Sequence, residues 1–275
     1  MGEDPEPQEI AVSALPDFER PPVIEVACGV QFRAVQGLRG MTLAPLYNQW
    51  IQDFPTVEEQ PPLPPVVEAS PMGGPAVQLF FGNTPDRRLW FIDATGSSLV
   101  QLQQDRLIVN WREGEPRAEY PRFASVRDNL SARLADLSDF LERESLGKLE
   151  ITHAEVSYIN AIDPQGQGFG ALDNIIQGWP TFPSHHLGQP RAARVAFEFP
   201  IPELGAGGGL AVSVGPGGRS NGEVALFMTM TAQGRTEGTS SDAALAFVDT
   251  AHEHVVRSFA ELTTDAQHTE WGRLS

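Results

Sequence analysis

Hydrophobic and polar residues alternate in three short runs in the middle of the chain. In the third run, Leu107, Val109 and Trp111 take one set of alternate positions, and polar side chains take most of the other set. A period of two places alternate side chains on opposite faces of a strand. Small and polar residues between the runs suit tight hairpin turns. The pattern predicts an antiparallel meander with one wet face, formed by residues 88–93, 99–103 and 106–112.

A helical period follows this meander. Apolar residues recur three or four positions apart, the spacing that gathers side chains on one face of a helix. Pro121 precedes them, and proline suits the first turn of a helix, where an N–H has no partner. We expect this helix to cover the dry face of the sheet with a stripe of Phe123, Val126, Leu130, Leu134, Leu137 and Leu141.

A strand and a short helix are predicted before the meander. Residues 24–32 alternate between apolar and small or polar side chains, which indicates a strand with one buried face. From Thr42, apolar residues at helical spacing predict a short helix that ends at Phe54-Pro55. Prolines then dominate residues 55–75 and favour an extended conformation. This segment is interpreted as a rigid strap over the sheet edge, with a docking motif for a proline-recognising domain as the alternative.

The second half of the chain repeats this order. Leu43, Leu46, Tyr47 and Trp50 have counterparts at identical spacing, 129 residues later, in Leu172, Ile175, Ile176 and Trp179. The preceding strands align at nearly the same offset. Strand-like runs at 194–199, 210–214 and 224–231 follow, and then a helix capped near Ser240 or Ser241. Its apolar stripe is Leu245, Val248, His252, Val255, Phe259 and Leu262.

This repeat predicts an α+β fold of two tandem β-α-β(3-4)-α units. The units are expected to form a curved antiparallel sheet, on which each half packs one long helix. The first unit is placed at residues 21–146 and the second at 147–275. Residues 1–20 are acidic and rich in proline, so they are predicted to be a disordered tail.

Composition narrows the function classes. The 36 acidic residues against 19 basic ones give a net charge of -17, which argues against nucleic-acid and anionic-membrane partners. The sequence shows no signal peptide and no apolar run long enough for a membrane span, so a cytoplasmic location is expected. The only cysteine, Cys28, lies in a predicted strand and is interpreted as core.

Two resemblances arise from these observations. The element order resembles the duplicated unit of TATA-binding-protein-like and helix-grip folds, which implies architecture alone. The sequence also resembles a sporadically distributed family of uncharacterised bacterial proteins, which supplies no reaction, ligand or catalytic residue. The matching motifs are PPVIEV at 21–26, GVQF at 29–32, EEQPPLPP at 58–65, LQQDR at 102–106, NWR at 110–112, YPRF at 120–123 and EVSYIN at 155–160.

Known catalytic signatures are missing from the sequence. The glycine-rich segments 205–209 and 215–218 have no P-loop lysine and do not open a helix, so they are interpreted as hairpin loops. Ser157 and Ser213 lack nucleophile-elbow glycines. No catalytic residue, metal ligand set or cofactor is therefore predicted. His252 is interpreted as a core or pocket-edge histidine, and His254 and His268 are expected to be exposed.

Six strand residues are candidates for ligand or partner binding. Arg106, Asn110 and Arg112 share a strand face and form either solvated charge or a patch for an anion or an acidic partner. His153 and Glu155 also share a face. The repeat makes Glu25 and Glu155 equivalent, so these carboxylates are expected to approach one another across a pseudo-twofold axis. The alternative is two unrelated glutamates in water.

The favoured function is a non-enzymatic binding or recognition protein. Its open sheet face or helix–sheet cleft would bind a protein partner or a small ligand, and the resembled family suggests an accessory role in a bacterial conflict or defence system. The alternative is a small-molecule sensor or an enzyme that uses the cleft between the sheet and the long helix. A deep apolar pocket with perturbed carboxylates would favour the alternative, and a shallow polar sheet face would favour the binding protein. The oligomeric state stays open.

Overall fold

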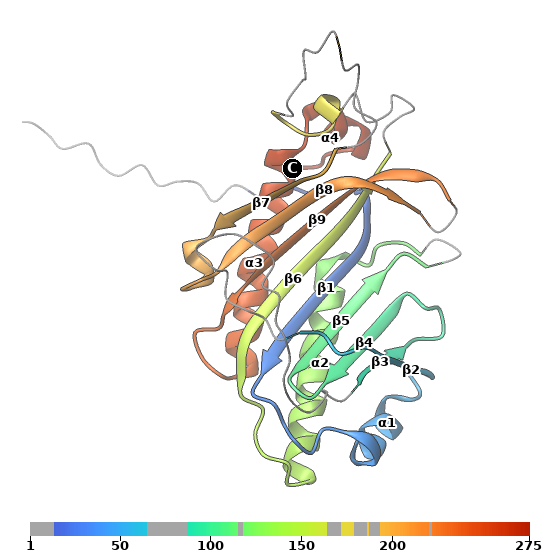
Figure 1. Ribbon diagram of the computed structural model, residues 1–275, viewed down its shortest axis with the longest axis vertical. Helices are drawn as coiled ribbons and strands as arrows, with labels where there is room; N and C mark the ends of the chain where they lie inside the picture. Colours follow the sequence, from blue (N-terminus) through green and yellow to red (C-terminus); the bar gives the residue numbers. More distant parts are fainter. Residues whose placement is uncertain are drawn as a thin grey trace, which may run out of the picture.

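The computed structural model describes residues 14–64, 87–114, 118–163, 172–178, 186, 193–219 and 222–275. Within these residues the fold is mixed α and β, with a nine-stranded antiparallel sheet in the order β2-β3-β4-β5-β1-β6-β9-β8-β7 (Figure 1). The strands are β1 (Val23–Phe32), β2 (Thr56–Gln60), β3 (Arg88–Ile92), β4 (Ser98–Gln103), β5 (Arg106–Arg112), β6 (Ile151–Ile162), β7 (Val195–Pro200), β8 (Gly209–Gly218) and β9 (Val224–Arg235). The helices are α1 (Ala44–Trp50), α2 (Arg122–Arg143), α3 (Ser241–Leu262) and α4 (Asp265–Trp271).

The pairing of β1 with β6 forms the centre of the sheet. Ala27 of β1 lies opposite Ser157 of β6, and the remaining strands extend outward on both sides. The two-residue period sorts the side chains by face. Val26 and Cys28 are fully buried on one face, while Glu25 on the other is half-buried. The predicted strands of both halves are confirmed, but the wet face expected for the meander is wrong, because Gln101, Arg106 and Asn110 are each no more than 7% exposed.

Helices α2 and α3 lie behind the sheet in Figure 1, on the face that carries the apolar strand residues. The predicted stripe of α2 is buried from Val126 to Leu141, with Phe123 only partly covered. Helix α3 begins after Ser240, whose hydroxyl accepts a hydrogen bond from the N–H of Ala243 at 3.2 Å. No helix among the described residues is long and apolar enough to cross a membrane.

The proline-rich segment crosses the opposite face of the sheet. The N–H of Leu63 donates to Gln103 Oε1 at 2.8 Å, and Arg106 Nη2 donates to the carbonyl of Pro64 at 3.0 Å. These partners belong to β4 and β5, which have neighbours on both sides. Residues 61–64 therefore lie over the sheet face rather than its edge, and residues 65–75 lie outside the described part of the chain. The interpretation of residues 55–75 as a strap was wrong for residues 56–60, which form the edge strand β2 and pair with β3.

The second short helix was predicted wrongly. Residues 172–174 form one 3-10 turn, and Trp179 lies outside the described residues. Leu172, Ile175 and Ile176 are buried as expected. The helix does not continue because the chain pairs with the end of α3: Ile176 bridges to Thr263, and the N–H of Gln177 donates to the carbonyl of Leu262.

The glycine-rich run at 215–218 is part of β8, and its interpretation as a loop was wrong. It pairs with Val224–Phe227 of β9. A Cβ atom at Gly217 would lie 2.6 Å from Cδ2 of Phe227, so the absence of a side chain at this position makes room for the aromatic ring.

The predicted tail is too long at its C-terminal end. Phe18 is 4% exposed, and its ring lies 5.8 Å from that of Phe259 and 5.9 Å from that of Trp271. The N–H of Leu274 donates to the carbonyl of Asp17. Helix α4, which the sequence pattern did not reveal, also buries His268, one of the two histidines expected to be exposed. Residues 14–19 are therefore docked, and residues 1–13 lie outside the described part of the chain.

Substitution of Phe18 tests this docking. Phe18→Ala is expected to lower the free energy of unfolding by ~3–5 kcal/mol, because a buried aromatic ring leaves a cavity. Urea denaturation measures the loss. Unchanged stability would mean that residues 14–19 are a free tail, as the sequence alone predicted.

Substitution of Leu134 tests the core of α2. Leu134 is 0% exposed, so Leu134→Ala is expected to cost ~2–5 kcal/mol. Ser138→Ala on the exposed side of the same helix is the matched control and should leave the unfolding midpoint nearly unchanged. Equal midpoints for the two variants would place the stripe outside the core.

Candidate functional site

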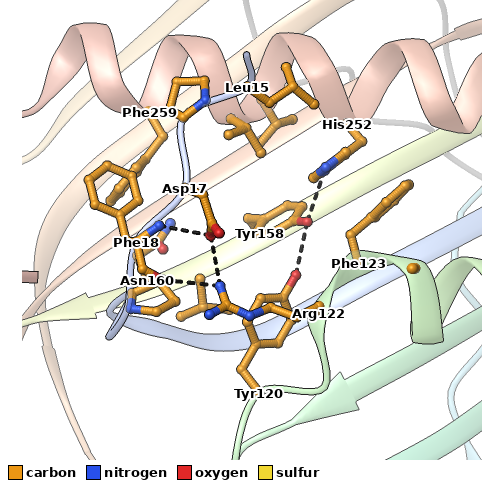
Figure 2. Close-up of a pocket in the computed structure, with 16 residues that line it drawn as sticks. Leu15, Asp17, Phe18, Tyr120, Arg122, Phe123, Tyr158, Asn160, His252 and Phe259 are labelled. Atoms are coloured by element: carbon orange, nitrogen blue, oxygen red, sulfur yellow. Dashed lines mark hydrogen bonds and ion pairs between the residues drawn. The ribbon is translucent and has the colours of Figure 1, made fainter. Parts of the chain in front are cut away.

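A cavity of about 390 Å³ lies between the helix-bearing face of the sheet, the start of α2 and the middle of α3 (Figure 2). Residues 15–18, which lead into β1, complete its wall. Most of the lining is hydrophobic. The apolar side chains include Leu15, Val23, Phe123, Val255, Val256 and Phe259.

A chain of hydrogen bonds runs inside this cavity. The hydroxyl of Tyr120 lies 3.1 Å from that of Tyr158, which lies 3.0 Å from Nδ1 of His252 (Figure 2). Each group comes from a different element, because Tyr120 precedes α2, Tyr158 belongs to β6 and His252 belongs to α3. The packing of both long helices on the sheet therefore assembles the chain of bonds.

The hydrogen-bonded chain is uncharged at neutral pH. Burial lowers the pKa of His252 from 6.5 to about 4, although nearby Asp249 acts in the opposite direction. Burial raises the pKa of Tyr120 to about 12 and that of Tyr158 well above its usual value. The imidazole of His252 also stacks on Phe123, with ring centres 3.7 Å apart. A neutral imidazole suits this apolar contact.

The hydrogen bonds that link Tyr120, Tyr158 and His252 can run in either of two directions. If His252 Nδ1 accepts from Tyr158, then Nε2 carries the proton, and the oxygen of Tyr120 offers a lone pair to the cavity. If Nδ1 donates instead, Nε2 becomes an acceptor and the hydroxyl of Tyr120 is free to donate. Within the described residues no hydrogen bond occupies Nε2. A bound molecule can therefore select either direction of these hydrogen bonds.

Asn160 adds a further polar group to the lining. It is 2% exposed and shares the helix-bearing face of β6 with Tyr158. Its Nδ2 donates to the carbonyl of Met228 at 3.2 Å. The remainder of the amide is a hydrogen-bonding group within the cavity wall.

Arg122 lies across the front of the pocket in Figure 2. Its Nη1 donates to Asp17 Oδ1 at 2.9 Å and to the carbonyl of Phe18 at 3.1 Å, and its Cζ lies 6.0 Å from the ring centre of Tyr120. The backbone of Arg122 has a φ of 70°. This left-handed conformation costs of order 1–3 kcal/mol in a residue other than glycine. Local strain therefore accompanies the placement of a guanidinium group at the rim.

The six residues predicted from the sequence lie on the opposite face of the sheet and form two groups. In the first, Asn110 Nδ2 donates to Glu25 Oε1 at 2.6 Å, and Gln101 Nε2 donates to Asn110 Oδ1 at 2.7 Å. Burial raises the pKa of Glu25, while the bond from Asn110 and the charge of Arg112 act against this shift. Arg112 Nε donates to the carbonyl of Gly96. These polar groups satisfy one another.

The second group lies further along β5 and on β6. Arg106, His153 and Glu155 line a cavity of only about 10 Å³, too small for a ligand. Burial raises the pKa of Glu155, and the charge of Arg106 opposes this shift. Because Arg106 also holds the carbonyl of Pro64, this group fixes the strap to the sheet.

The expected approach of Glu25 to Glu155 does not occur. Glu25 lies opposite Ile159, four residues beyond Glu155, and Glu155 lies opposite Gly29. Four residues correspond to ~14 Å along a strand. Antiparallel pairing centred on Ala27 and Ser157 moves the two carboxylates to opposite sides of the centre. Each finds partners of its own, so the two do not share a ligand.

Most residues of the pocket were not predicted from the sequence. Tyr158 and Asn160 occupy positions in the period of β6 that are apolar elsewhere, as at Ala154 and Val156. Polar side chains in a buried apolar period are an informative signal. The interpretation of His252 as a core or pocket-edge residue is resolved in favour of the pocket edge. Arg122 and Asp17 gave no signal, because their meeting depends on the tertiary structure.

Other chemistry is limited in the described part of the chain. It holds no group of three or more histidine, cysteine or acidic side chains that could bind a metal ion. Cys28 is buried in the core, and burial raises the pKa of its thiol to about 12.

Comparison with protein-family models, curated proteins and solved structures finds no match to this chain. The pocket is therefore interpreted from its geometry.

His252 is expected to make the protein less stable in acid. Between pH 6.5 and about 4 the unfolded chain binds a proton at this residue that the folded chain does not. The free energy of unfolding therefore falls as pH drops through this window, by up to about 3 kcal/mol from this residue. Urea denaturation at a series of pH values should show a flatter acid limb for His252→Gln.

The comparison between variants isolates the histidine. The raised pKa values of Glu25 and Glu155 give contributions of opposite sign, but they are common to both proteins. His254→Gln, two positions along α3, is the matched control and should keep the wild-type slope. Identical slopes for wild type and His252→Gln would contradict the burial of a neutral imidazole.

Proposed function

We propose that this protein is a non-enzymatic small-molecule-binding protein and that the pocket between the sheet and the long helices is its binding site. The observation that carries the proposal is an uncharged chain of polar groups inside a mainly apolar cavity of about 390 Å³. The sequence suggested either a non-enzymatic recognition protein or a sensor or enzyme that uses the helix–sheet cleft. The present proposal takes the recognition role from the first and the cleft from the second.

The composition of the pocket supports this proposal. Ligand sites typically measure ~300–1,000 Å³ and combine apolar walls with a few convergent polar groups. Here Tyr120, Tyr158 and His252 converge from three elements, with Asn160 nearby. These groups form hydrogen bonds with one another, and in the described part of the chain Nε2 of His252 and the outer side of the Tyr120 hydroxyl keep hydrogen-bonding capacity that can orient a ligand.

Binding is favoured over catalysis by the ionisation of these groups. General acid–base catalysis works best when the pKa of the catalytic group lies near the working pH. Burial moves the pKa of His252 down to about 4 and that of Tyr120 up to about 12. Neither group is suited to exchange protons readily at neutral pH, whereas both can orient a bound molecule by hydrogen bonds.

The polar sheet face is less suited to recognition. The amide of Asn110 is bonded to Glu25 and Gln101, and the strap at 61–64 is bonded to Gln103 and Arg106. These groups would have to break internal hydrogen bonds before binding a partner. No specific observation favours this face as a second site.

We also propose that the two halves are copies of one unit. An offset of 130 makes Ser157 the counterpart of Ala27, and the register pairs these two residues directly, as an axis of pseudo-twofold symmetry requires. By the same offset, Tyr158 corresponds to Cys28, which is 0% exposed. On this reading, Tyr158 places a polar group at a position that an apolar core residue occupies in the first copy. That difference supports a function for the pocket.

Filling the cavity tests the proposed site. N-phenyl-naphthylamine, a neutral apolar dye that fluoresces when it leaves water, is expected to bind the wild-type protein. Val256→Trp should abolish this signal because the indole would occupy the space that Val256 lines.

Val224→Trp is the matched control. Val224 is 58% exposed and does not line the pocket, so this variant should bind the dye like the wild type. Far-UV circular dichroism checks that both variants fold. Absence of dye binding to the wild type, or equal binding by both variants, would overturn the proposed site.

A further inference from the structure

We infer that the pocket accepts apolar monocarboxylates, and that the carboxylate of the ligand replaces that of Asp17 on the guanidinium of Arg122. This inference rests on the proposed binding function and specifies its ligand class. It also implies that binding changes how the segment at 15–18 is held. Three features of the rim support it.

The first feature is an anion position that the chain itself fills. Asp17 Oδ1 accepts from Arg122 Nη1 at 2.9 Å and from the N–H of Phe18 at 2.8 Å (Figure 2). A carboxylate is therefore already accommodated at the edge of the apolar cavity. A ligand with the same head group and an apolar body could occupy the cavity and this position together.

The second feature is the balance of charge. Among the described residues that line the cavity, Arg122 and Asp17 alone carry charged side chains at neutral pH, because the imidazole of His252 is neutral. Once Asp17 is displaced, one positive charge remains for the ligand. The chain carries a net charge of -17, which disfavours polyanions such as nucleotides. A single carboxylate matches what the pocket offers.

The third feature is the exposure of the ion pair. Arg122 is held by the carbonyl of Phe18 and the ring of Tyr120 as well as by Asp17. The pair is exposed, with 48% of the Arg122 side chain and 54% of the Asp17 side chain accessible, and exposed ion pairs are weak. A ligand that covers Arg122 with apolar groups would form the same contact with less water around it, and so with greater strength.

Two neighbouring features favour the same head group. Helix α2 begins at this rim with no acidic residue in its first turn and no side-chain cap, so its dipole adds to the attraction of an anion. The hydroxyl of Tyr120 can donate to a carboxylate oxygen if Tyr158 donates to Tyr120 and His252 Nδ1 donates to Tyr158. A carboxylate would then select one direction of the hydrogen-bonded chain.

The test compares naphthoate with naphthamide, which has nearly the same shape and no charge. Isothermal titration at neutral pH measures both ligands with wild type, Arg122→Gln and Asp17→Asn. Wild type should prefer naphthoate, and Arg122→Gln should remove this preference with about a tenfold loss of affinity for naphthoate alone. Asp17→Asn should bind naphthoate more tightly than wild type, because it removes the competing carboxylate and keeps the side-chain shape.

The two substitutions thus have opposite effects on one ligand, which loss of fold would not produce. Should Arg122→Gln fail to fold, Asp17→Asn decides the question alone. Equal binding of naphthoate and naphthamide by the wild type, or naphthoate binding no tighter in Asp17→Asn, overturns the inference and leaves the proposed site intact. If the wild type binds none of the three compounds, naphthoate, naphthamide and the neutral dye, the proposed function fails as well.

Discussion

The antiparallel pairing of β1 with β6 is the constraint on which the rest of the structure depends. It joins the two halves of the chain at the centre of one sheet, and it brings α2 and α3 together on one face. A bidentate pair between Arg127 and Asp249, at 3.0 and 2.9 Å, links these helices directly. The pocket lies where the start of α2, the middle of α3 and the end of β6 meet. A shift of β6 by one residue would move Tyr158 to the other face and remove the polar chain.

The polar side chains on the two faces of the sheet differ in what their hydrogen-bonding groups contact. Glu25, Asn110 and Gln101 form hydrogen bonds with one another, and Arg106 and Gln103 hold the strap, so these groups stabilise the fold. On the helix-bearing face, Tyr120, Tyr158 and His252 border open volume, and Nε2 of His252 forms no hydrogen bond with any residue that the structure describes. Buried polar groups next to accessible apolar space are the arrangement that ligand recognition requires.

Local periodicity was enough to predict both long helices and the strands of the sheet other than β2, because burial imposes a period of two on strands and about 3.6 on helices. It failed where tertiary contacts override local preference. The chain after Leu172 pairs with the end of α3 and does not continue as a helix. The glycine-rich run at 215–218 continues strand β8, where the absence of a side chain at Gly217 leaves room for the ring of Phe227. Phe18 docks on Trp271, 253 positions later in the sequence, which no local pattern reveals.

The candidate site was predictable only in part, for the same reason. His252 interrupts an apolar helical stripe, and Tyr158 interrupts a buried strand pattern, so both leave a trace in the sequence. The ion pair of Arg122 with Asp17 joins residues 105 positions apart and leaves no such trace. A crystal structure of the protein with bound naphthoate would show directly whether the pocket is the binding site. We expect the ring system to lie between Phe123 and Val256, the carboxylate to bind Arg122, and Asp17 to be released. Naphthoate bound on another surface, with the pocket unchanged, would contradict this binding mode.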